Sequence, residues 1–125
     1  MALRVAAGVL VAVAAAGLAV LECFLVPLRV GSVRFPICVL LAVAGNILLA
    51  RLAARQTGSP RAGAVPPAVW LVAVVLLSLP RPEGDVVVEG SLTGLVFLFA
   101  GSVAGAYGAA REITRRARPV APVRR

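Results

Sequence analysis

The sequence predicts an all-α membrane protein, a bundle of four transmembrane helices with both termini in the cytoplasm. Three observations support this fold class. Hydrophobic residues make up 61% of the 125-residue chain, and charged residues only 14%. The mean hydropathy is +1.00, well above that of a soluble domain. Four apolar runs also reach the roughly 17 to 25 residues that a helix rising about 1.5 Å per residue needs to cross the hydrocarbon.

The four runs are expected to form one domain over residues 1–118. Glu22 interrupts the first run, and Asn46 lies inside the second. Residues 119–125 follow as a cytoplasmic tail that contains Arg and Pro. The predicted helices cover about residues 5–27, 35–54, 64–80 and 90–112.

Arginine side chains predict the orientation, because cytoplasmic loops retain positive charge during insertion. Three of the 13 basic residues fall on one side of the predicted spans, namely Arg29, Arg34 and Arg81. The other ten fall on the side of the termini: Arg4, Arg51, Arg55, Arg61, Arg111, Arg115, Arg116, Arg118, Arg124 and Arg125. The chain is therefore expected to be a multi-pass protein of the cell (plasma) membrane whose termini lie inside.

Aromatic side chains agree with this orientation, because amphipathic rings settle where headgroups meet hydrocarbon. Trp70 and Tyr107 are expected near the cytoplasmic interface, and Phe24 and Phe35 near the outer one. The first run, from Met1 onward, also has features of a signal peptide, which is the less favoured alternative.

Small residues are expected where the helices touch, because helices in lipid associate through close packing and a few hydrogen bonds. The fourth run carries Gly101, Gly105 and Ala109 at a spacing of four. Packing within the chain is favoured over a dedicated dimer face. Asn46 and Ser102 are expected at similar depth, where they could hydrogen-bond across the bundle.

Glu22 is the candidate intramembrane acid, because an ionisable group inside the bilayer is costly and is therefore a functional candidate. Counted from Pro27, its backbone lies only about 7 Å below the outer interface. The favoured interpretation is a side chain that snorkels or pairs with Arg29 or Arg34. A proton-coupling or cation-binding role is the alternative.

Cys23 and Cys38 lie at similar depth on adjacent predicted helices, so they are a candidate disulfide on the oxidising side of the membrane. Two reduced thiols facing lipid are the alternative. The chain has no His and no C-x-x-C spacing, so no metal site and no cofactor are expected.

The outer loop after the third run reads PRPEGD and is the candidate outer contact, through Arg81, Glu83 and Asp85. Two prolines stiffen it, and Gly84 permits a positive φ between the carboxylates. The alternative is a rigid solvated turn in which Arg81 pairs with a carboxylate.

Basic residues after the fourth run are expected to contact an anionic inner leaflet, since each juxtamembrane Arg contributes on the order of 1 kcal/mol there. The residues concerned are Arg111, Arg115, Arg116 and Arg118. Nucleic-acid binding is not expected, because the basic residues flank the membrane spans and lack interleaved aromatics. Enzymatic activity is also not expected, because the chain offers no phosphate-binding Gly loop and no His for acid–base chemistry.

The run from Trp70 to Asp85, WLVAVVLLSLPRPEGD, resembles the signature of a small actinobacterial family of four-helix membrane proteins of unknown function. The resemblance implies the four-span architecture and carries no activity. The layout is also similar to that of small multidrug-resistance transporters, which have four helices and a membrane-embedded Glu in the first.

Two functions follow from these features. The favoured one is a non-catalytic accessory or scaffold subunit of a membrane complex, with an unidentified membrane protein as its partner. The alternative is a small proton-coupled transporter, working as a homodimer and using Glu22.

Overall fold

The computed structural model describes residues 1–34, 36–84 and 90–117. Four helical segments are each long and apolar enough to cross a membrane, the third being Pro60–Ser78, so the predicted all-α four-helix fold is confirmed. A 3-10 helix, η1, forms the start of the third. The helices are α1 (Ala2–Leu25), α2 (Ile37–Thr57), η1 (Pro60–Ala64), α3 (Val65–Ser78) and α4 (Leu92–Ala117).

The helix ends occur where the sequence offers residues that stop or start a helix. Pro27 follows the last turn of α1 and has no N–H to donate. Gly58 ends α2 with a φ of +70°, the left-handed conformation that glycine adopts without a Cβ penalty. Pro66 and Pro67 lie in the first turn of α3, where their missing N–H groups cost nothing.

A two-stranded hairpin joins α1 to α2. Its strands are β1 (Arg29–Val30) and β2 (Val33–Arg34), which pair antiparallel with Arg29 opposite Arg34. Gly31, in the turn between them, has a φ of +65°. The tight turn returns the chain within a few residues, so α2 starts beside the end of α1.

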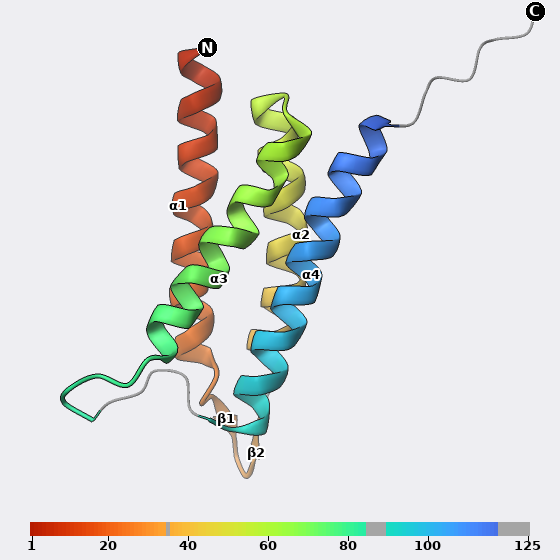
Figure 1. Ribbon diagram of the computed structural model, residues 1–125. Coiled ribbons are helices and arrows are strands. Elements are labelled where there is room, and N and C mark those ends of the chain that lie inside the picture. The colour runs from red at the N-terminus through yellow and green to blue at the C-terminus, as the bar shows by residue number, and fades with distance from the viewer. Residues whose placement is uncertain (35, 85–89, 118–125) are drawn as a thin grey trace, which may run out of the picture.

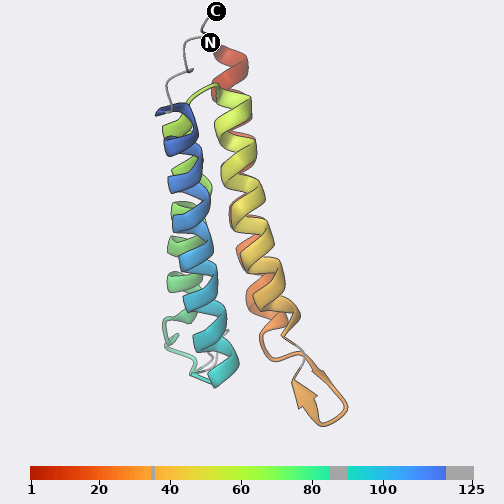
Figure 2. The same ribbon diagram turned by 90° about the vertical axis from the view of Figure 1, so that its right-hand side faces the viewer.

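The helices form two antiparallel pairs, α1 with α2 and α3 with α4, and the two pairs pack against each other (Figures 1 and 2). α1 packs on α2 and α3, and α4 packs on α2, α3 and η1. Met1 and the C-terminal end of α4 lie at one end of the bundle, and the hairpin lies at the other (Figures 1 and 2). Among the described residues, the basic side chains at the end that carries Met1 are Arg4, Arg51, Arg55, Arg61, Arg111, Arg115 and Arg116, and Arg29 and Arg81 lie at the opposite end.

Small residues fill the interior of the bundle. Ala15, Ala19, Ala42 and Ala50 are fully buried. At Gly108 an added Cβ would lie 3.2 Å from the Cα of Ile47, so α4 approaches the backbone of α2 closely. Many larger apolar side chains point outward instead, among them Leu10, Leu40, Leu76 and Phe99. This inversion suits a chain surrounded by lipid, in which close packing rather than the hydrophobic effect joins the helices.

Candidate functional site

The candidate site is a buried pair formed by Glu22 of α1 and Trp70 of α3. The indole Nε1–H of Trp70 donates a hydrogen bond of 2.6 Å to Glu22 Oε2. Both side chains are buried, with exposures of 0% and 1%. The second carboxyl oxygen, Oε1, has no hydrogen-bond partner among the described residues. The pair therefore ties α1 to α3 with one bond and leaves one acceptor unused.

Two glycines from the other helices make room for this pair. A Cβ at Gly101 of α4 would overlap the Trp70 ring, so the indole lies directly on the α4 backbone. A Cβ at Gly45 of α2 would overlap the Leu18 side chain and lie 3.6 Å from Glu22 Oε1. All four helices thus meet around the pair of Glu22 and Trp70.

Phe97 of α4 completes the surroundings of the indole. Its ring meets the Trp70 ring edge to face, with centroids 5.5 Å apart and an interplanar angle of 66°. Such pairs contribute roughly 0.5–1.5 kcal/mol beyond their burial. The Trp70 side chain is therefore held on its ring by α4 and at its N–H by α1.

The position of Trp70 corrects the expectation that this side chain lies near the cytoplasmic interface. Trp70 is eight residues before Ser78, and Gly101 is nine residues after Leu92. At about 1.5 Å per residue, Trp70 is roughly 12 Å along α3 from Ser78, and Gly101 is roughly 14 Å along α4 from Leu92. The indole occupies the middle of the bundle, not its rim.

Glu22 also lies deeper than its place in the sequence suggests. Its backbone is only three residues from the last residue of α1. However, side chains on a helix point toward the helix N-terminus, which for α1 is toward the middle of the bundle. The carboxyl group neither snorkels nor reaches solvent; it accepts its hydrogen bond from Trp70.

Asn46 lies one residue beyond Gly45 and is also buried. Its Nδ2 donates to the carbonyl oxygen of Ala42 at 2.9 Å, and its Oδ1 has no partner among the described residues. Ser102 Oγ donates to the carbonyl of Leu98 at 2.7 Å. Each of the two predicted polar contacts is therefore made within its own helix and not across the bundle.

The Asn46 side chain nevertheless faces α4. An added Cβ at Gly105 would lie 3.6 Å from Asn46 Oδ1 and 2.8 Å from the Pro67 side chain. The small-residue row predicted on the fourth helix thus provides room at Gly101 for Trp70 and at Gly105 for Pro67 and Asn46. Gly101 and Gly105 therefore allow close contacts between helices of the same chain.

Cys23 and Cys38 are both free thiols and both buried. They lie in one apolar cluster with Ala19, Val26 and Ala42. The candidate disulfide is not formed, and the alternative of thiols facing lipid does not hold either, because each is 0% exposed.

The predicted outer contact is only partly described. Arg81 and Glu83 are exposed, and Asp85 lies outside the described residues. Gly84 has a φ of +80°, and its N–H donates to the carbonyl of Arg81 at 2.9 Å. The segment therefore makes the tight turn that its sequence predicted, with two charged side chains in solvent.

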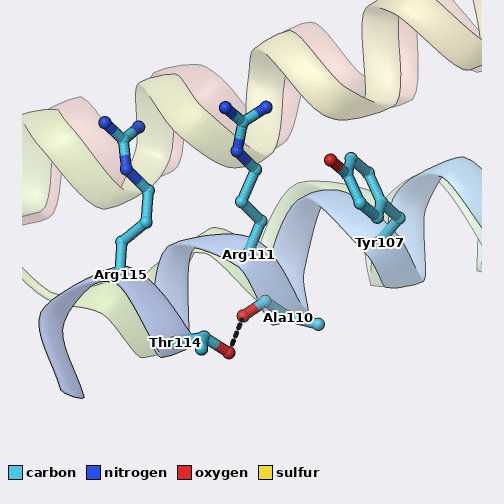
Figure 3. A pocket seen from close by; sticks show the side chains of 5 residues that line it. All are labelled: Tyr107, Ala110, Arg111, Thr114 and Arg115. Carbon is cyan, nitrogen blue, oxygen red and sulfur yellow. Dashed lines mark hydrogen bonds between the residues drawn. The ribbon is translucent and has the colours of Figure 1, made fainter. Parts of the chain in front are cut away.

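The basic residues at the other end of the bundle separate into two groups. Arg116 Nη1 donates to the carbonyl of Gly58 at 2.7 Å, which fastens the end of α4 to the turn after α2. Arg111 and Arg115 instead project from one side of α4, beyond Tyr107 (Figure 3). Arg118 lies outside the described residues.

Sequence reasoning missed Trp70 as the partner of Glu22, although a signal was present. A buried indole N–H needs an acceptor, and Glu22 is an intramembrane group that can supply one. Within residues 1–34, 36–84 and 90–117, no three His, Cys, Asp or Glu side chains are grouped so that they could hold a metal ion.

Comparison with known proteins gives one match. A family model described as a family of unknown function, DUF6113, matches residues 2–124, almost the whole chain. Among curated proteins nothing matches. Solved structures likewise give no match.

Proposed function

Since the chain belongs to the DUF6113 family, whose function is unknown, we propose from its own geometry that it is a non-catalytic accessory or scaffold subunit of a membrane protein complex. The observation that carries this proposal is that Glu22 is buried and hydrogen-bonded to Trp70. The intramembrane acid is bonded to Trp70 and has no exposure to water, so it holds the helices together in the described conformation.

The charged groups that a partner could contact lie at the two ends of the bundle. At one end are Arg81 and Glu83, on a turn fixed by Gly84. At the other end are the Arg side chains of α1, α2, η1 and α4. Because ten of the 13 basic residues belong to the end that carries the termini, the positive-inside rule supports placing that end in the cytoplasm of a cell membrane.

A pull-down from the native membrane tests the proposal. The tagged full chain is extracted in a gentle detergent, and its mass and its partners are measured together. We expect a second protein in fixed stoichiometry, lost when Glu83→Gln and Asp85→Asn remove both carboxylates. Glu22→Gln is the control, because its amide oxygen still accepts from Trp70 and it leaves the surface unchanged. A chain that is recovered without a stoichiometric partner contradicts the accessory role.

The second candidate is a small dimeric proton-coupled transporter, favoured by two buried oxygens that have no hydrogen-bond partner in the part of the chain that the structure describes. Glu22 Oε1 lies beside Gly45, and Asn46 Oδ1 belongs to the next residue of α2. Such unpaired acceptors are costly in a dry interior and could receive a proton or a cationic group.

Proteoliposomes containing a pH-sensitive dye test the transporter candidate. A lipophilic aromatic cation added outside should drive proton release through the wild type and not through Glu22→Gln. Equal proton release by the two proteins, or by empty liposomes, excludes Glu22 as the coupling group. A recovered homodimer in the pull-down, together with flux that requires Glu22, would replace the accessory role with this one.

A further inference from the structure

We infer that the exposed surface of α4 near its C-terminal end binds the phosphate of an anionic glycerophospholipid, with Arg111 and Arg115 as the phosphate ligands. Independent observations carry this inference, and it does not rest on the proposed function. It narrows the four basic residues that the sequence associates with the membrane to two that share one surface.

The two guanidinium groups are arranged as neighbours. Arg111 and Arg115 are four residues apart on α4, which places their side chains one above the other on the helix surface. Figure 3 shows both extending side by side, with Tyr107 one turn earlier. With Ala110 and Thr114 these residues line an open depression of about 630 Å³. Two planar, always-charged groups one helical turn apart suit a phosphate, whose oxygens accept paired N–H bonds.

Thr114, in the depression, and Glu112, next to Arg111 in the chain, leave this role to the guanidinium groups. Thr114 Oγ1 donates to the carbonyl of Ala110 at 2.8 Å, so its proton is used within the helix. Glu112 approaches Arg115 Nη1 only to 4.0 Å, and the Arg115 side chain is still 51% exposed. Arg115 therefore keeps donors available for a ligand.

Arg116 provides the contrast. Its side chain turns toward the body of the protein and donates to the carbonyl of Gly58. One basic residue of the helix end thus anchors the fold, while Arg111 and Arg115 remain on the surface.

The order of apolar, amphipathic and cationic side chains along α4 matches the order of groups in a lipid molecule, which a soluble anion does not have. Phe99, Val103, Tyr107, Arg111 and Arg115 follow one another at intervals of four residues. Phe99 and Val103 are 73% and 52% exposed, although both are apolar. The row turns by about 40° around α4 at each step and changes from apolar to amphipathic to cationic over about 24 Å along the helix axis. Acyl chain, glycerol and phosphate follow each other in the same order, and Tyr is the residue type that settles at the level between them.

Lipid titration of the purified full-length protein, followed by native mass spectrometry, tests the inference. Phosphatidylglycerol and phosphatidylcholine are compared as ligands for the wild type and for the double variant Arg111→Gln, Arg115→Gln. Because juxtamembrane Arg contributes on the order of 1 kcal/mol each, the double variant should bind phosphatidylglycerol about 30-fold more weakly. Its binding of phosphatidylcholine should weaken much less, because the choline ammonium offsets the charge of the phosphate in that lipid.

The matched control is the double variant Arg4→Gln, Arg61→Gln. It removes the same charge from the same end of the bundle, from residues of α1 and η1 that are also exposed. We expect it to retain the wild-type affinity to within about threefold, because screened charges away from the ligand contribute little. Emission from Trp70, the single tryptophan of the chain, reports whether each variant keeps its buried core.

Three results would overturn the inference. Equal losses in the two double variants would mean diffuse attraction by net charge without a site. Equal affinity of the wild type for the two lipids would mean that the net negative charge of the headgroup is not recognised. Displacement of phosphatidylglycerol by millimolar inorganic phosphate would identify the site as one for a free anion. If the Gln variants do not keep their core, the wild-type lipid comparison and the phosphate competition still test the second and third of these results.

Discussion

At the scale of single residues, the buried hydrogen bond between Glu22 and Trp70 joins two distant parts of the chain, α1 and α3. The two residues are 48 positions apart, and both are completely enclosed by the bundle. A buried acceptor that loses its donor bears the desolvation cost without compensation. The bond should therefore matter more when it is broken on one side than when both partners are replaced by apolar groups.

Trp70→Phe is predicted to destabilise the bundle by about 1–3 kcal/mol. The substitution removes the N–H donor to Glu22 and keeps an aromatic ring against Phe97. Unfolding in mixed micelles, followed by circular dichroism, measures the change in free energy. The same substitution in a Glu22→Leu background is the control and should cost less, because no carboxyl group is then left unpaired. Equal costs in the two backgrounds would show that the indole acts through packing alone.

Sequence reasoning could identify Glu22 but not its surroundings. An acid within an apolar run is visible in one dimension, and so is its cost. Its partner is not, because contact with Trp70 depends on which face of α3 turns inward and on the direction in which the Glu22 side chain leaves α1. Depth counted along the backbone therefore placed the carboxyl group too near the surface.

At the scale of helices, glycines determine how closely α4 approaches its neighbours. Gly101 accommodates the Trp70 ring, and Gly108 lies against the α2 backbone. The spacing of these glycines could be read from the sequence and correctly indicated a helix contact surface. The identity of the neighbour could not, since every helix in the chain offers small residues.

Gly101→Ala is predicted to destabilise the bundle by about 1–3 kcal/mol, because its Cβ would overlap the Trp70 ring and force the two helices apart. Thermal unfolding in detergent measures the loss. Gly17→Ala is the matched control, because nothing lies within 4 Å of the position of its Cβ on α1. The control should be neutral or slightly stabilising, as alanine favours helix more than glycine does. A Gly101→Ala protein as stable as the control would mean that the indole can shift without cost.

At the scale of the whole molecule, the number of spans could be predicted because four long apolar runs leave few alternatives. The fold then places Met1 and the end of α4 at the same end of the bundle (Figure 1). The side of the membrane on which this end lies is not a property of the fold. It depends on the distribution of Arg relative to the membrane during insertion, which the sequence supplies and the packing of the helices does not.

Cysteine labelling in intact cells tests the predicted orientation without changing the native thiols, because Cys23 and Cys38 are buried and should not react in the folded protein. Glu83→Cys places a thiol on the exposed turn; it is preferred to Gly84, whose positive φ would strain a Cys. Gln56→Cys places one at the opposite end, near the last turn of α2, where the side chain is exposed. A membrane-impermeant maleimide added outside should label the first variant at once and the second only after permeabilisation, with the unsubstituted protein unlabelled in both conditions. The reverse pattern would place ten of the 13 basic residues outside, and the anionic lipid bound by Arg111 and Arg115 would then have to belong to the outer leaflet.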